Sequence, residues 1–534
     1  MKNRTKRVDK INFIVIINTM SYTVEQKIGN NIYVYEVESY WDPQKKQPRQ
    51  RRRYIGKKDP ITGEVVTPRK GFTPRIARDY GHVYLLEHLG RRIGLYDALK
   101  EAFSGLFREI FYLSLYQLLE AKPLYLYPLW AEASYLKEDM IISSQRISRI
   151  VEKIGRSDDL RQKFFALWRK RMGSMQAVIF DITSLSSYSE LIEYLEWGYN
   201  RDKDHLPQIN FGLIIAYPSK LPLSYRIYPG SIKDVTTLKN TVAHLDELEV
   251  KDVMFILDRG FYSASNIEDM DLQGIRFIIP LPFSTKLSSQ LISQSQSELS
   301  SPLNGFYYRN RLMFHIERDT SISKVNLKAH IYHDEKRKVD EVDTLFKRIC
   351  EIEKDVALKK FRCREDVRDF IEGCLRGGSR LFEITGTAPS FNLKRRVKAI
   401  SRLINRMGRM ILITNKIDLE KEEILSFYRK KDKLEKMFDV MKNEITSGRL
   451  RVRSQHSVEG RIFITFVSLI LYSELHRIMK EKELYSKYTI PEVFFELKKL
   501  RRVEMTNGKE YLTEVSKKQR TLFEKFEVPV PVGT

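Results

Sequence analysis

Strand and helix patterns alternate between residues 177 and 279, and this order constrains the fold more than any other feature of the chain. Short apolar runs rich in Val, Ile, Phe and Leu predict strands at 177–180, 211–217, 223–228, 253–257 and 277–279. Longer segments at 234–248 and 263–272 predict helices. The resulting order, three strands, a helix, a strand, a helix and a strand, is typical of an α/β domain built on a mixed sheet.

Two of these strands end in an aspartate. Asp181 follows the run 177–180, and Asp258 follows the run 253–257. The C-terminal ends of strands are where α/β sheets place functional groups. If the two strands are neighbours, their carboxylates lie close together and repel each other unless a divalent cation neutralises them. The alternative is structural, because an aspartate after a strand is often a helix cap or a turn former.

A long helix predicted from about 419 to 445 supplies a third acid. At about 100° per residue, its polar stripe consists of Tyr428, Lys431, Glu435 and Lys442. The adjoining face is apolar and can dock on the sheet; it consists of Phe427, Leu434, Phe438, Met441 and Ile445. A carboxylate flanked by cations suits a metal ligand with phosphate-binding neighbours. The alternative is a solvated helix with i,i+4 ion pairs, and Asp432 and Asp439 compete as the acid.

The charge of the chain favours a polyanionic partner. Lys and Arg number 93 against 69 Asp and Glu, a net charge of +24. Nucleic acid is the first candidate partner, ahead of an anionic membrane surface and of a merely solvated basic surface. No apolar run approaches the ~20 residues of a membrane span, so we expect no membrane insertion. The three cysteines have no CxxC spacing, which fits a reducing, cytoplasmic location on DNA.

The motif set as a whole resembles that of DDE insertion-sequence transposases, which have an RNase H-like catalytic core. The matching stretches are residues 180–184, 257–263 and 428–442. The last is similar to the Y-x2-R-x3-E-x6-K motif of the YREK subgroup, as in the insertion sequence 4 and 1634 groups. Tyr428, Glu435 and Lys442 stand at the motif spacing. Lys431 replaces the Arg, which keeps the charge but loses the bidentate fork.

The resemblance implies a fold and a division of the chain. The fold is α/β, an RNase H-like mixed-sheet core interrupted by a mainly β insertion, with a small β and helical N-terminal region. The expected segments are 1–20, a mis-called leader; 21–72, a basic β module; 73–172, a helical region for DNA binding or dimerisation; 173–282, the first part of the core; 283–405, the insertion; 406–480, the second part of the core with the catalytic helix; and 481–534, a basic C-terminal tail.

The resemblance also implies a mechanism. Asp181, Asp258 and Glu435 would bind two Mg²⁺ ions, for which Mn²⁺ can substitute, and would cut and join DNA by phosphoryl transfer. Tyr428, Lys431 and Lys442 would hold DNA phosphates, with Arg259 near the metals. The partners would be double-stranded DNA with terminal inverted repeats and a target DNA, bound by a homodimer. Two alternatives are an RNase H-like nuclease without strand transfer and a decayed transposase that only binds DNA.

Overall fold

The computed structural model describes residues 21–67, 73–136, 140–189, 192–198, 206–232, 234–445, 452 and 454–532. The expected leader at 1–20 lies outside this range. The described chain forms two compact units. One contains residues 21–67, 73–77 and 503–511, and the other contains residues 78–502 and 512–532. Each unit is described by itself.

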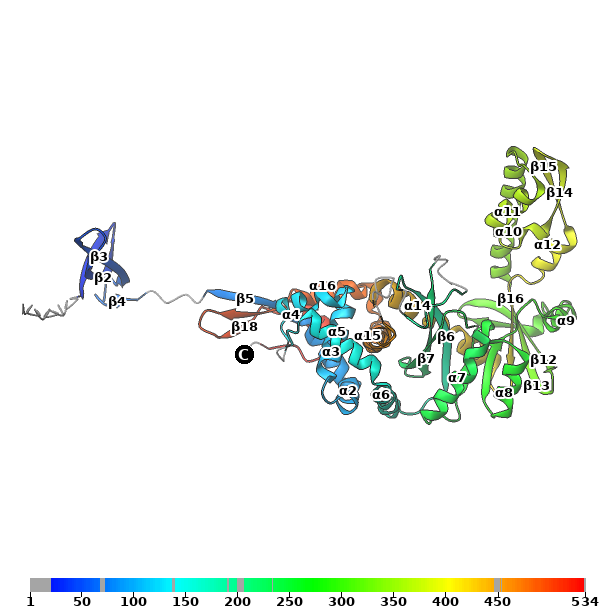
Figure 1. Cartoon of the computed structure of the whole chain (residues 1–534), viewed down its shortest axis with the longest axis horizontal. Helices are drawn as coiled ribbons and strands as arrows, with labels where there is room; N and C mark the ends of the chain where they lie inside the picture. Colours follow the sequence, from blue (N-terminus) through cyan, green and yellow to red (C-terminus); the bar gives the residue numbers. More distant parts are fainter. Residues whose placement is uncertain are drawn as a thin grey trace, which may run out of the picture. The chain divides into compact units, whose positions relative to one another are not determined.

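The smaller unit carries the β structure expected for the N-terminal module (Figure 1). Its antiparallel sheet has the order β1-β2-β3-β4, with β1 Ser21–Ile28, β2 Asn31–Asp42, β3 Gln47–Lys58 and β4 Val65–Val66. Val34 and Val37 are its buried side chains, whereas β3 carries four exposed arginines: Arg49, Arg51, Arg52 and Arg53. A three-stranded sheet has the order β18-β17-β5 and contains β5 Pro74–Asp79, β17 Arg501–Met505 and β18 Glu510–Leu512.

A nine-stranded sheet forms the centre of the larger unit, in the order β11-β12-β13-β16-β10-β9-β6-β7-β8. The five strands predicted from the alternating pattern lie together at one end of this order. They are β6 Ala177–Ser186, β7 Gln208–Tyr217, β8 Pro222–Pro229, β9 Met254–Ile256 and β10 Arg276–Pro280. β9 is parallel to both β6 and β10, and the other pairings are antiparallel. The predicted α/β class and mixed sheet are therefore confirmed.

The larger unit also contains a helical region, helices between the core strands, and the long buried helix α15. The helical region contains α1 Gly81–Arg92, α2 Leu95–Ala102, α3 Phe107–Glu120, α4 Tyr127–Ala133, α5 Ser144–Arg156 and α6 Asp158–Arg171. The crossovers between core strands contain α7 Asp234–Glu247 and α8 Ala264–Leu272. In the described chain α15 Gln455–Glu481 is long and apolar enough to span a membrane, but 83% of its most apolar window is buried inside the protein. It packs on α3, α5 and β8 as a core helix.

Two glycines allow α5 and α15 to cross closely. A Cβ atom on Gly155 would stand 1.8 Å from the carbonyl oxygen of His456, and one on Gly460 would stand 1.8 Å from that of Val151. Ser143 caps α5 by accepting a hydrogen bond from the Arg146 backbone N–H at 3.3 Å. The buried face of α5 thus packs closely against the core helix α15.

The inserted segment is not the mainly β domain expected. Its first part contains the strands β11 Gly305–Tyr308, β12 Arg311–Ile322 and β13 Val325–Asp334. These strands extend the central sheet, because β13 pairs with β16 Arg409–Thr414. Beside them lies α9 Lys286–Ser295. The remainder is mostly helical and has its own apolar core; it contains α10 Glu335–Leu358, α11 Arg364–Cys374, the hairpin β14 Phe382–Thr387 and β15 Ser390–Arg395, and α12 Val397–Ile404 (Figure 1). Apolar residues three or four apart in α10 explain the helix; they are Leu345, Ile349, Ile352 and Val356.

The C-terminal segment is also not a polar tail. α16 Ile490–Lys498 and α17 Lys517–Lys525 pack against each other and belong to the main core. Leu522, Phe523 and Phe526 are buried there, and the Phe523 ring meets the Tyr84 ring edge-on at 5.8 Å. A few widely spaced apolar residues thus anchor a segment whose overall composition is basic.

Candidate active site on β6 and after β9

Strand register brings the two predicted aspartates level with each other. β6 and β9 pair in parallel, with Ala177 opposite Met254 and Ile179 opposite Ile256. Asp181 and Asp258 each lie two residues beyond the last of these pairs, so they stand at the same level. Asp258 follows the end of β9, as predicted, but β6 continues past Asp181 to Ser186, so Asp181 lies within its strand and not at the strand end that the sequence predicted. Asp181 is buried, and one of its carboxylate oxygens accepts a hydrogen bond from the Ile182 backbone N–H at 2.8 Å. Asp258 is partly exposed.

The Asp234 carboxylate lies close to the loop after Asp258, a position that the sequence does not predict. A Cβ atom on Gly260 would stand 2.7 Å from a carboxylate oxygen of Asp234, the first residue of α7. Glycine at 260 therefore lets that carboxylate approach the loop closely. Ser263 caps α8, because its side chain accepts a hydrogen bond from the Asn266 backbone N–H at 3.0 Å.

The predicted catalytic helix is interrupted close to its acid. α13 Lys421–Arg429 ends in a tight turn, α14 Asp432–Val440 follows, and Met441–Ile445 is π-helical. The Lys431 backbone N–H bonds to the Tyr428 carbonyl at 3.0 Å, an i→i−3 bond that tightens the turn. The apolar face forms as predicted, because Leu434, Phe438 and Met441 are buried. The turn and the π-helical segment depart from the single regular helix predicted for residues 419–445, although Lys430 and Lys431 keep right-handed helical backbone angles.

All three predicted acids converge on one ammonium group. The Lys431 Nζ atom lies 2.9 Å from an Asp258 carboxylate oxygen, 3.6 Å from one of Glu435 and 3.7 Å from one of Asp181. Lys431 is only 7% exposed, although the Glu435 side chain is 62% exposed. The cluster is thus buried on the sheet side and open to solvent on the α14 side. We call these four residues the acid–lysine cluster.

Charge explains the protonation state of the cluster. Burial alone would lower the pKa of the Lys431 ammonium, but the negative charges of Asp181 and Asp258 outweigh this effect and hold the pKa above its ordinary value. Burial raises the pKa of the Tyr428 hydroxyl to about 12, an effect that the charge on Lys431 partly offsets. The ammonium is therefore charged and the Tyr428 hydroxyl is neutral near pH 7.

The acid–lysine cluster has the donor chemistry of a divalent-metal site with a cation already inside it. Among the residues that the structure describes, no group of three or more His, Cys, Asp or Glu side chains is arranged to hold a metal ion. The contacts to Lys431 show why, because the ammonium stands between the carboxylates. Carboxylate oxygens are the ligands that Mg²⁺ prefers. The residues therefore fit a divalent cation, provided that the ammonium leaves.

Of the remaining predicted site residues, Tyr428 and Arg259 lie beside the cluster, and Lys442 follows farther along the helix. Tyr428 is half-buried, and the charges of Lys431, Asp258 and Arg259 influence the pKa of its hydroxyl. Arg259 is exposed at the start of the turn Arg259–Phe261, directly after Asp258. Lys442 is half-buried in the π-helical segment. The role expected for Lys431 does not fit its position, since a buried ammonium that faces the acids does not face a phosphate in solution.

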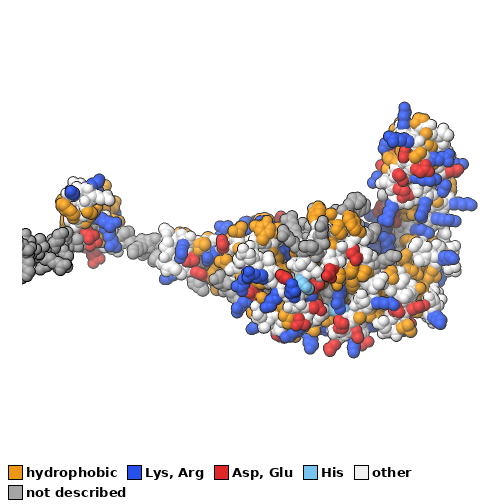
Figure 2. Space-filling model, in the orientation of Figure 1, with side chains coloured by type: hydrophobic (Ala, Val, Ile, Leu, Met, Phe, Trp, Pro, Cys, Tyr) orange, Lys and Arg blue, Asp and Glu red, His pale blue; other side chains and the backbone are white. Residues whose placement is uncertain are grey.

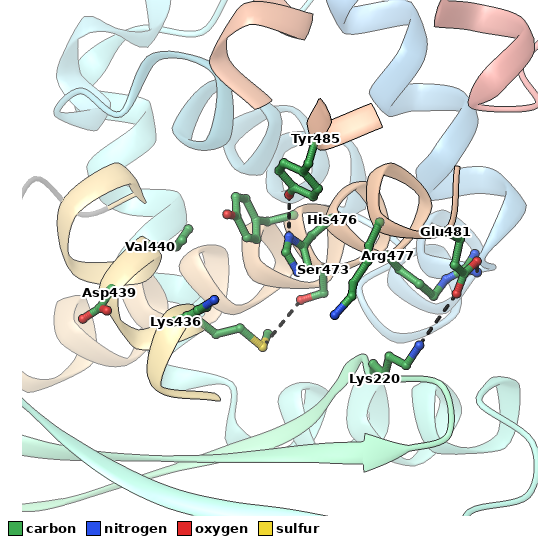
Figure 3. Close-up of a pocket in the computed structure, with 12 residues that line it drawn as sticks. Lys220, Lys436, Asp439, Val440, Ser473, His476, Arg477, Glu481 and Tyr485 are labelled. Carbon is green, nitrogen blue, oxygen red and sulfur yellow. Dashed lines mark hydrogen bonds and ion pairs between the residues drawn. The ribbon is translucent and has the colours of Figure 1, made fainter. Parts of the chain in front are cut away.

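Another side of α14 borders a cavity of about 320 Å³ (Figure 3). Its lining comes mainly from α14 and α15 and includes Lys436, Tyr472, His476 and Tyr485. Two of its charged groups already pair, since Lys220 lies 3.8 Å from Glu481, which also binds Arg477 at 2.6 Å. None of the predicted site residues lines this cavity.

Comparison with known proteins agrees with this architecture. Residues 172–471, more than half of the chain, match the family model described as the transposase DDE domain, and the chain belongs to this family. No curated protein matches the sequence. Among solved structures, a piggyBac transposase synaptic complex with hairpin DNA is similar at 9% identity and a TM-score of 0.33, over 85% of this chain and 77% of that one. A score this low carries no argument about either fold or function. Family membership makes the protein a DNA transposase by class.

Proposed function

We propose that this protein cuts DNA at the ends of an insertion sequence and joins those ends to target DNA, with Asp181, Asp258 and Glu435 as its catalytic acids. The observation that carries the proposal is the convergence of these three acids on one position from separate elements. The acids are 77 and 177 residues apart along the chain, so local sequence does not bring them together. The turn at Lys431 and the register of β6 with β9 do.

Each residue has a distinct part in the proposed reaction. When bound, Mg²⁺ or Mn²⁺ would activate the attacking water or 3′-hydroxyl and stabilise the leaving oxygen. Asp181 and Asp258 are fixed by strands and would hold that metal in a set position, while the exposed Glu435 would complete the site from α14. Arg259 is exposed beside Asp258 and can hold a DNA phosphate through its guanidinium fork. Tyr428 and Lys442 would contact the same strand of DNA.

Charge supports DNA as the partner. The chain has a net charge of +24, and Lys and Arg side chains are spread over the visible face of the larger unit among acidic ones (Figure 2). In the smaller unit, six of the twelve residues of β3 are basic and none is acidic. We propose double-stranded DNA with terminal inverted repeats and a target DNA as substrates, a homodimer on DNA, and a cytoplasmic location on the nucleoid. We also place the chain in the YREK subgroup, on the residues at 428, 435 and 442.

The test uses purified full-length protein, Mg²⁺ or Mn²⁺, and labelled DNA that carries the ends of the element. Asp258→Ala and Glu435→Gln are compared with Asp432→Asn, a matched control because Asp432 is an exposed acid on the same helix. We expect the wild type and the control to cut the ends and join them to target DNA, and the first two variants to do neither.

Three other outcomes would contradict this proposal. Metal-dependent cutting without joining would identify a nuclease. End binding without cutting in either metal would identify a decayed transposase that only binds DNA. Cleavage that survives in Asp258→Ala would show that the catalytic acids lie elsewhere.

A further inference from the structure

We infer that Lys431 is an internal counter-ion that keeps the acid–lysine cluster closed until a divalent cation displaces it. This inference rests on the proposed function, because it concerns the same three acids. It assigns Lys431 a positioning role that differs from holding phosphate. The starting observation is that one ammonium lies within 3.7 Å of three carboxylates.

The first step concerns charge. Asp181 is buried, and an uncompensated buried carboxylate is costly. Lys431 brings one positive charge against three negative ones, so the four groups together retain two negative charges. This excess attracts a divalent cation. The cation and the ammonium nevertheless need the same oxygen atoms and repel each other, so they cannot occupy the cluster together.

The second step concerns movement. Lys431 lies in the turn between α13 and α14, not in the middle of either helix. Its side chain is a flexible four-carbon stem. The mostly exposed Glu435 side chain marks the open side of the cluster, which gives the ammonium a direction in which to leave. Once outside, the ammonium stands on the side from which DNA would reach the acids.

The neighbouring residue provides a matched control. Lys430 has the same side chain and lies in the same turn, but its Nζ atom sits 3.5 Å from the Tyr217 ring centre and 3.8 Å from the Phe427 ring centre. Replacing either lysine by Gln removes one positive charge from the same turn. Only the change at Lys431 removes a charge that competes directly for the carboxylates.

The experiment measures Mn²⁺ binding to the metal-free, full-length protein by titration calorimetry, without DNA. Lys431→Gln is expected to bind Mn²⁺ at least about tenfold more tightly than the wild type, since a repelling charge within 4 Å has been removed. Lys430→Gln is expected to bind like the wild type. Equal or weaker binding by Lys431→Gln would overturn the inference, and so would an equal gain in both variants. Absence of Mn²⁺ binding in every protein would overturn it as well.

A second measurement uses the wild type alone, so it does not depend on a variant that folds. Acetic anhydride labels exposed lysines, and mass spectrometry reports the extent at each residue. Lys431 is expected to be protected without metal and to be labelled several-fold faster when Mn²⁺ is added, while the exposed Lys436 stays constant. Unchanged labelling of Lys431 would overturn the inference. If both measurements succeed but DNA is not cut, the counter-ion role stands and the proposed function fails.

Discussion

Replacement of Gly460 by Ala tests the close crossing of α5 and α15 with a single methyl group. The added Cβ would stand 1.8 Å from the Val151 carbonyl oxygen, whereas real Cβ atoms essentially never come within 3.0 Å of another heavy atom. The obstacle is backbone, so no side-chain rotation relieves it. The two helices must therefore separate by about 1.2 Å.

The size of the effect follows from two unfavourable terms and one favourable term. Overpacking of a tight core costs about 1–3 kcal/mol. Separation by about 1 Å also forfeits roughly a quarter to a half of the dispersion energy across the contact. Alanine is better than glycine in a helix by about 1 kcal/mol, which offsets part of this loss. We expect Gly460→Ala to lower the free energy of unfolding by about 2 kcal/mol.

The assay is urea unfolding of the full chain followed by circular dichroism, with Gly373→Ala as the control. Gly373 lies in α11, and a Cβ atom there would meet nothing within 4 Å. The control should be neutral or stabilising by up to about 1 kcal/mol. A Gly460→Ala protein that unfolds at the wild-type urea concentration would refute the close crossing and the packing argument built on it.

Further predictions concern DNA binding, pH and the core beneath the catalytic helix. Replacing Arg51 and Arg53 of β3 by Gln should reduce the slope of log K against log salt for duplex DNA by about two, and an unchanged slope would exclude β3 from the DNA interface. Burial lowers the pKa of His330 from 6.5 to about 4, so the unfolded chain takes up a proton first as the pH falls. Stability from this histidine is complete above pH 6.5 and is lost as the pH falls toward 4, a decline in urea midpoints that His330→Gln should reduce. Leu434 is fully buried beside Glu435, and Leu434→Ala should cost about 2–5 kcal/mol of unfolding free energy; a loss below 0.5 kcal/mol or so would contradict its docking on the core.

Much of the core could be predicted because its signals are local. The apolar runs before Asp181 and Asp258 are buried strands, as their composition predicts, whereas their pairing as neighbours is seen only in the structure. The buried face of α14 could also be predicted, since Leu434 and Phe438 are four residues apart. These features need only the period of the apolar pattern.

The rest depends on contacts that no local pattern reveals. Lys430 and Lys431 are ordinary helix formers, so nothing in the sequence marks the turn between α13 and α14. The inward position of Lys431 depends on acids from two distant strands. Likewise, the C-terminal helix α17 looks like a polar tail until the core that receives Phe523 is known. The charged composition of this segment does not reveal that a few apolar residues attach it to the main core.

The route of the chain through the inserted segment has a consequence for how such enzymes diversify. β13 and β16 are hydrogen-bonded neighbours, and the Asp334 backbone N–H donates to the Gly408 carbonyl at 2.8 Å. Residues 335–408 therefore leave the sheet and return to it at the same place, and they have a separate apolar core. These residues are the connection between two neighbouring antiparallel strands, enlarged into a small subdomain. Because the ends of this connection stay together whatever it contains, such an inserted subdomain can be enlarged, shortened or exchanged while the strands that carry the acids keep their register.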